Sequence, residues 1–148
     1  MKIINAGVTA PKGFKCAGLR AGVKSGKTNK DMAMIVSEVP AKIEGTFTKN
    51  IVKAAPVLWG KKIVEEQEAV RAVVINTGIA NACTGAQGYE NVVTEAKEVA
   101  KLLDIKPEEV VVGSTGVIGQ QLPMDVIKEG IKKLVPELKA DRQSEEDA

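Results

Sequence analysis

Residues 113–119, GSTGVIG, place three glycines at a spacing of three around one serine and one threonine, with no charged side chain. They follow an apolar run, EEVVV, and precede a run with helical spacing, LPMDVIKEGIKKLV. Backbone N–H groups and a hydroxyl at the end of a strand can stabilise the negative charge that develops on a carbonyl oxygen during acyl transfer. Thr115 and Gly116 are therefore candidates for an oxyanion hole. The alternative is structural: the glycines form a tight strand-to-helix turn and Thr115 caps the helix.

A second segment of similar composition, NTGIANACTGAQG at residues 76–88, also lies between an apolar run and a helix-like run. In open α/β sheets, ligands bind beyond the carboxyl ends of strands, where helix N-termini offer backbone N–H groups. Asn76 and Asn81 could contact a substrate, or they could satisfy the loop backbone in Asx turns. Cys83 is expected to be a small buried thiol, and Thr84 is expected to begin the helix.

Histidine is absent from the chain, which excludes a Ser-His-Asp or Cys-His nucleophile assembled from these residues alone. Zinc is disfavoured as well, because the only two cysteines, Cys16 and Cys83, are far apart in the sequence. Neither glycine-rich segment matches the G-x-x-x-x-G-K-[ST] or G-x-G-x-x-G phosphate-binding patterns. Ser114 lies between Gly113 and Thr115, so the G-x-S-x-G nucleophile elbow is excluded too. No metal and no cofactor are expected.

Composition indicates one globular domain of 148 residues with an aliphatic core, since 44% of the residues are hydrophobic and only 3% are aromatic. The 21 basic and 19 acidic residues leave a net charge of +2, which gives no broad electrostatic case for binding nucleic acid or an anionic membrane. No apolar run approaches the roughly 20 residues of a membrane span, and the first residues lack the pattern of a signal peptide. We therefore expect a cytoplasmic protein.

Hydrophobic patterning predicts strands and helices along the chain. Strands are expected for MAMIVS, RAVVIN and EEVVVGS, and KIEGTFTKN alternates as a half-exposed strand that forms a hairpin with the first. Helices are expected over AAPVLWGKKIVEEQEAV, YENVVTEAKEVAKLLD and residues 123–135. The expected fold class is α/β, a mixed β-sheet layered with helices, over residues 1–138. The polar residues 139–148 are expected to be frayed or to mark a truncation point.

Three long segments resemble the N-terminal part of the ornithine acetyltransferases, the glutamate N-acetyltransferases of arginine biosynthesis that are also called the ArgJ family. The segments begin AGVTAPKGFKCAGLRAG, VVINTGIANACTGAQG and VVVGSTGVIGQQLPMD, in that order, and together span nearly the whole chain. Their NACTG and STGVIG-x-x-LPMD motifs are long and specific. The resemblance implies a DmpA/ArgJ-like N-terminal-nucleophile architecture that a second chain completes.

In this family the precursor cleaves itself before a threonine, which becomes the N-terminal nucleophile of the β chain and uses its own α-amine as base. The acetyl group passes from N-acetylornithine to that threonine and then to glutamate. The resemblance thus implies that this sequence is part of an α chain, with Thr115 and Gly116 as the oxyanion hole. It also implies an α2β2 heterotetramer, with the nucleophile on the β chain, beyond Ala148.

Two features depart from the family pattern. Ile79 stands where the family usually has the second Asn of NSGNANACTG, and the family's α chain continues past Ala148. The motifs do not separate monofunctional members from bifunctional ones, which also take acetyl from acetyl-CoA. Two alternatives stay open: a self-cleaving aminopeptidase or amidase of related fold, and a non-catalytic small-ligand-binding domain.

Overall fold

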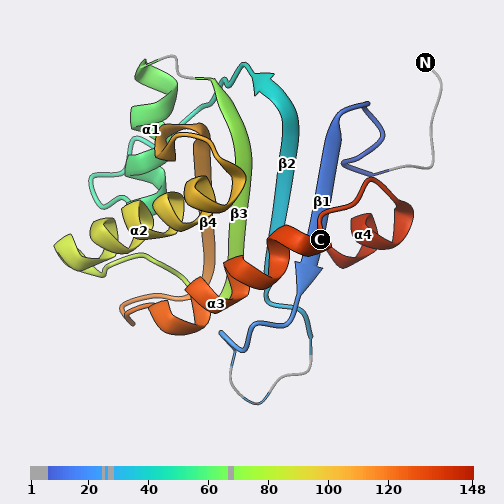
Figure 1. Cartoon of the computed structure of the whole chain (residues 1–148). Coiled ribbons are helices and arrows are strands. Elements are labelled where there is room, and N and C mark those ends of the chain that lie inside the picture. Colours follow the sequence, from blue (N-terminus) through green and yellow to red (C-terminus); the bar gives the residue numbers. More distant parts are fainter. Residues whose placement is uncertain (1–6, 25, 27–28, 67–68) are drawn as a thin grey trace.

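The computed structural model describes residues 7–24, 26, 29–66 and 69–148. Four strands form one sheet in the order β1-β2-β3-β4, with β1–β2 and β2–β3 antiparallel and β3–β4 parallel. The strands are β1 (Phe14–Leu19), β2 (Met32–Ala41), β3 (Val70–Ile79) and β4 (Val110–Val117). The helices are α1 (Ala55–Glu66), α2 (Gly85–Leu103), α3 (Met124–Leu134) and α4 (Arg142–Asp147), with 3-10 turns η1 (Pro107–Glu109) and η2 (Val135–Glu137). The predicted mixed sheet layered with helices is confirmed (Figure 1).

The β3-α2-β4 segment is a parallel crossover unit that places two strand ends side by side. Because β3 and β4 run in the same direction, their carboxyl ends meet at one edge of the sheet. The connection between β1 and β2 reaches the same edge, at the bottom of Figure 1. Both glycine-rich segments singled out above therefore lie at this edge, as does the start of β2.

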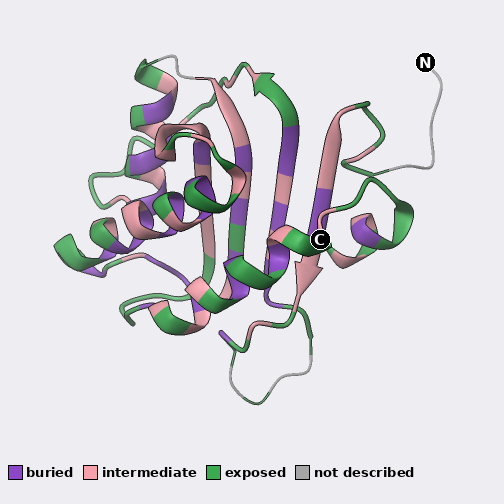
Figure 2. Ribbon diagram, in the orientation of Figure 1, coloured by how far each residue is buried: buried purple, intermediate pink, exposed green. Residues whose placement is uncertain are grey.

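One face of the sheet packs against α1, α2 and α3, whose inner sides are buried and whose outer sides are exposed (Figure 2). The helical spacing in the sequence identified this core, and its helix residues are Ala55, Trp59, Ile63, Val92, Ala96, Val99, Ala100, Ile127, Ile131 and Leu134. The Trp59 indole N–H donates to the Val110 carbonyl at 2.8 Å and so attaches α1 to β4. Within the described ranges, no helix has the length and apolar character needed to cross a membrane.

The opposite face of the sheet carries the alternate residues of each strand. Ile35, Val73 and Val111 lie across it and are half-buried, while Ile75 is 37% exposed. Helix α4 contacts this face at β1, where the absence of a side chain on Gly18 leaves room for the helix backbone. The β3 and β4 part of the face keeps apolar side chains in partial contact with water.

Residues 139–148 differ from the frayed segment that their polarity predicts. The Asp141 carboxylate accepts a hydrogen bond from the Ser144 N–H at 2.8 Å and caps α4. Glu145 accepts hydrogen bonds from Thr9 and from the Gly7 N–H, which ties α4 to the beginning of the described chain. The polar side chains of this segment satisfy backbone groups, so order here comes from hydrogen bonds to distant residues and not from an apolar face.

The strand predicted for KIEGTFTKN does not form: residues 42–54 contain neither helix nor strand. A hairpin onto Met32–Val36 of β2 is excluded because β1 and β3 pair with both sides of this stretch. The segment runs instead along α1, where Phe47 lies 3.7 Å from the point at which a Cβ on Gly60 would project. The Phe47 ring thus packs over Gly60, at a distance where a Cβ would make ordinary van der Waals contact.

Candidate active site

Thr115 and Gly116 belong to β4, not to a turn between a strand and a helix. In the parallel ladder Thr115 pairs with Thr77, and Gly116 pairs with Gly78. Helix α3 begins only at Met124, so Thr115 is too far from it to act as its cap. The structural alternative for Thr115 is therefore wrong, and the two candidate residues lie where β3 and β4 end together.

Gly116 has a backbone conformation and a neighbour that both require glycine. Its φ of +132° is one that side-chain-bearing residues rarely adopt. A Cβ at this position would also overlap the carbonyl group of Gly78 on the adjacent strand. The two strands consequently approach one another closely at this point, where Gly116 is exposed.

The direction of the Gly116 N–H follows from the hydrogen bonding of its neighbour. The Ala80 N–H donates to the Val117 carbonyl at 2.9 Å, so the polar backbone groups of Val117 face β3. Successive residues of a regular strand alternate in this respect, and this pattern predicts that the N–H of Gly116 faces away from β3. In the described sheet β4 is the last strand, so the pattern places this N–H on the side of β4 that has no neighbouring strand.

The Thr115 hydroxyl is the second available donor. Thr115 and Gly116 are both exposed, and among the described residues the Thr115 hydroxyl has no hydrogen-bond partner. A hollow of about 550 Å³ opens nearby on the second face of the sheet. It is lined by Thr77, the register partner of Thr115, and not by Thr115 itself. Two uncharged donors at one strand end can hold an oxyanion without having to release a charge of their own.

Two hydrogen bonds through Ser114 connect the glycine-rich segments to each other. The Ser114 hydroxyl donates to the Ile79 carbonyl at 3.1 Å and accepts from the Asn81 N–H at 3.0 Å. Beyond the strand, the Gly119 N–H donates to the Ala82 carbonyl at 2.8 Å. The segment after β3 and the segment after β4 therefore form one connected unit that holds the position of the oxyanion candidates.

The two asparagines of the first segment are buried and donate to backbone carbonyls, but neither forms the Asx turn that the sequence suggested. The Asn81 side chain is fully buried, donates to the Gly88 carbonyl at 2.8 Å and accepts from the Thr84 hydroxyl at 2.7 Å. Thr84 is the residue before the first turn of α2, as expected. Asn76 donates to the Ile79 carbonyl at 2.9 Å and closes the end of β3. These contacts position the segment and leave neither amide facing solvent.

Cys83 is exposed, so the prediction of a buried thiol is wrong for it, whereas Cys16 is buried. Cys83 adopts a positive φ of 57° at the outer corner of the short connection between β3 and α2, which turns it away from the core. Burial raises the pKa of the Cys16 thiol, and the carboxylates of α4 and its cap add to the effect. No histidine exists to activate either thiol.

Three polar residues near the site were missed from the sequence. Gln121 donates to the Thr84 carbonyl at 2.9 Å and accepts from Asn91 at 3.3 Å, which links the segment after β4 to α2. Glu95, one turn beyond Asn91, is 1% exposed, and burial raises its pKa to about 8. Asn91 and Glu95 share the helical spacing of the apolar residue Val92, and that spacing could have identified both as buried.

Replacing Ser114 with alanine is expected to lower the free energy of unfolding of the complete gene product by about 1–3 kcal/mol, because the Asn81 N–H and the Ile79 carbonyl lose their shared partner. Denaturant-induced unfolding measures this change. Thr48→Ala is the matched control: its hydroxyl also accepts from a backbone N–H, but at an exposed position where water replaces it. Equal effects of the two substitutions would contradict a stabilising role for Ser114.

Comparison with proteins of known sequence shows what the chain is similar to. A model of the ArgJ family matches residues 15–148. The arginine biosynthesis bifunctional protein ArgJ of Streptococcus mutans is 47% identical over 135 residues, which cover 91% of this chain and 34% of the relative. The chloroplastic ArgJ of Citrullus lanatus is 46% identical over 137 residues, which cover 93% of this chain and 30% of the relative. The chain thus spans about a third of the length of these curated relatives.

Solved structures agree with the sequence comparison. Ornithine acetyltransferase from Mycobacterium tuberculosis, solved in complex with ornithine, superposes with a TM-score of 0.91 at 40% identity, over 96% of this chain and 76% of that chain. The ArgJ protein of Bacillus halodurans gives a TM-score of 0.90 at 39% identity, over 98% of this chain and 74% of that chain. The family match, the sequence identities and the shared fold together show that the chain belongs to the ArgJ family.

Proposed function

We propose that this chain is the α-chain part of a glutamate N-acetyltransferase, which moves acetyl from N-acetylornithine to glutamate. The observation that carries the proposal is the pair of exposed, uncharged donors, the Thr115 hydroxyl and the Gly116 N–H, at the joint ends of β3 and β4. The names of the relatives, arginine biosynthesis proteins and an ornithine acetyltransferase, supply the substrate class. The donors fit acyl transfer, in which negative charge collects on one carbonyl oxygen.

In the proposed reaction, the threonine hydroxyl at the start of the β chain attacks the acetyl carbonyl of N-acetylornithine, and the α-amine of that threonine takes its proton. The carbonyl oxygen becomes an oxyanion that Thr115 and Gly116 stabilise. Collapse of this intermediate breaks the C–N bond, and ornithine leaves with the proton. The amine of glutamate then attacks the acetyl-threonine ester, and the same two donors stabilise the second oxyanion. The C–O bond breaks to give N-acetylglutamate, and the α-amine passes the proton that the glutamate amine loses to the threonine oxygen, which restores the hydroxyl.

The partner in this proposal is the β chain of the same precursor, assembled as an α2β2 heterotetramer. Exposed apolar side chains near the candidate site support a surface that the β chain covers. Val117 is 56% exposed and Ile118 is 62% exposed. The second face of the sheet adds half-buried apolar residues beside them. Contiguous exposed apolar groups of this kind mark association surfaces. Light scattering on the complete gene product, which should give the mass of two α and two β chains, tests the assembly.

Ornithine release from N-acetylornithine by the complete gene product, measured with and without glutamate, tests the activity. Glutamate-dependent release with matching formation of N-acetylglutamate is the expected result. Release that does not depend on glutamate would overturn acetyl transfer and favour the hydrolase alternative. Absence of any release would favour the non-catalytic ligand-binding alternative. Replacing N-acetylornithine with acetyl-CoA in the same assay separates a bifunctional from a monofunctional enzyme.

A further inference from the structure

The connection between β1 and β2 brings a positive charge to the candidate active site that the mechanism above does not use. Lys24 is exposed on this connection, and its Cβ lies 3.0 Å from the point at which a Cβ on Gly78 would project. On its other side, Gly78 pairs with Gly116 of the oxyanion pair. Lys24, Gly78 and Gly116 therefore lie next to one another at the carboxyl ends of β3 and β4.

Asp31 fixes the position of Lys24 in this arrangement. The Asp31 carboxylate is buried and accepts hydrogen bonds from the backbone N–H groups of Ala21 at 2.6 Å, Gly22 at 3.1 Å and Lys24 at 3.0 Å. Its own carbonyl accepts from the Thr77 N–H at 2.9 Å. Charge-assisted bonds of this kind are stronger than neutral ones. The turn that carries Lys24 is thus held from two sides against the end of β3.

The charge of Lys24 is available to a ligand. Within the described part of the chain Lys24 forms no ion pair, and the carboxylate of Asp31 is occupied by backbone donors. The ammonium of a lysine can extend roughly 5 Å beyond its Cβ, which is enough to reach past Gly78 toward the neighbouring strand. N-acetylornithine and glutamate each carry a carboxylate on the carbon that bears the reacting nitrogen. An acyl group held at Gly116 would therefore have that carboxylate close by.

We propose that Lys24 binds the α-carboxylate of the amino-acid substrate, on a turn that Asp31 holds in place. The identity of the substrate in this inference rests on the proposed function. A charge-assisted hydrogen bond contributes enough to change the affinity about tenfold to a hundredfold. Because the carboxylate keeps its charge through the reaction, Lys24 contributes equally to ground-state and transition-state binding. Its removal should raise KM and leave kcat nearly unchanged.

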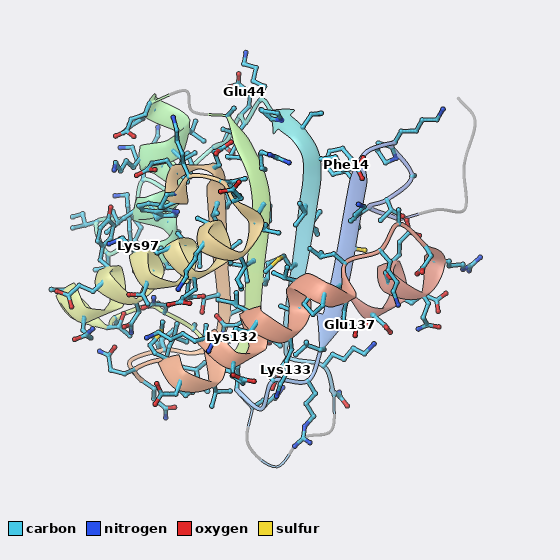
Figure 3. The ribbon with its side chains drawn as sticks, in the orientation of Figure 1. Phe14, Glu44, Lys97, Lys132, Lys133 and Glu137 are labelled. Carbon is cyan, nitrogen blue, oxygen red and sulfur yellow. The ribbon has the colours of Figure 1, made fainter. Side chains whose placement is uncertain are left out.

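The test compares two ligands that differ only in the carboxylate, ornithine and putrescine, for binding to the complete gene product by calorimetry. Lys24→Met keeps the aliphatic stem that packs on Gly78 and removes the charge. It is expected to weaken ornithine binding about tenfold to a hundredfold and to leave putrescine binding unchanged. Lys24→Arg is expected to restore most of the ornithine affinity. Lys97→Met, on the outer side of α2 (Figure 3), makes the same chemical change away from the site and should alter neither affinity.

Equal weakening of both ligands by Lys24→Met would overturn the inference, since the lysine would then act only through packing. Unchanged ornithine binding, or no ornithine binding to the wild type, would overturn it as well. The activity assay is a separate readout. Carboxylate-dependent binding through Lys24 without acetyl transfer would keep the inference about the site and refute the proposed reaction. Acetyl transfer that is insensitive to Lys24→Met would keep the proposed reaction and refute the inference about Lys24.

Discussion

Thr115→Ala is expected to lower kcat for acetyl transfer by about 100- to 1,000-fold, the usual effect of removing one oxyanion-hole donor. Thr115 is exposed and makes no side-chain hydrogen bond within the described ranges, so its hydroxyl is available to the reacting carbonyl. The oxyanion exists only along the reaction path, so the loss should fall on kcat and spare substrate affinity. Steady-state kinetics on the complete gene product, with both chains present in equal amounts, measure the change.

Two further substitutions separate the hydroxyl from the shape of the side chain. Thr115→Val keeps the β-branched outline that suits a strand and should be as slow as the alanine variant. Thr115→Ser keeps the hydroxyl and should stay within about tenfold of the wild type. The free energy of unfolding should change by less than about 0.5 kcal/mol in all three, as at other exposed positions. Wild-type turnover by the valine variant would remove the Thr115 hydroxyl from the mechanism.

The local elements were predictable because their patterns are local. Ala55, Trp59 and Ile63 repeat every four residues, and the apolar runs that became β3 and β4 are long enough to be read as buried strands. What a strand pairs with is not local. The alternation of KIEGTFTKN satisfies the pattern of a strand, yet Met32–Val36 of β2 already pair with β1 on one side and β3 on the other. The polar helix α4 forms because Glu145 accepts from residues at the opposite end of the chain.

The candidate site, too, was predictable from the sequence only in its local features. The residue types of GSTGVIG pointed to Thr115 and Gly116, but composition alone could not distinguish a turn from the end of a paired strand. The distinction depends on Gly78, which pairs with Gly116. A positive φ of 114° and the close approach of Lys24 both favour glycine at this position. Three segments that are distant in the sequence thus meet at one point. Sequence spacing within any one of these segments does not predict that the three come together in the fold.

Glu95→Gln is expected to stabilise the protein at neutral pH, and increasingly so as the pH rises. Burial holds the pKa of Glu95 at about 8, against an ordinary value of 4.5, and in the described residues its Oε1 has no hydrogen-bond partner. Between these two values the folded protein keeps a proton that the unfolded chain has released. The free energy of unfolding therefore falls with rising pH, by up to about 1.4 kcal/mol for each pH unit, and the fall levels off above pH 8.

From pH 4.5 to pH 7 this cost is on the order of 3 kcal/mol, and a neutral glutamine of the same shape does not incur it. Denaturation midpoints of the complete gene product between pH 5 and pH 8.5 measure the difference between variant and wild type, which should widen steadily with pH. Glu90→Gln, an exposed carboxylate on the same helix, should follow the wild-type curve. If the Glu95→Gln curve also ran parallel to the wild type, Glu95 could not be the buried neutral carboxyl inferred here. Its position one turn from Asn91, which bonds to Gln121, would then indicate an ionised carboxylate stabilised by the polar contacts near the candidate active site.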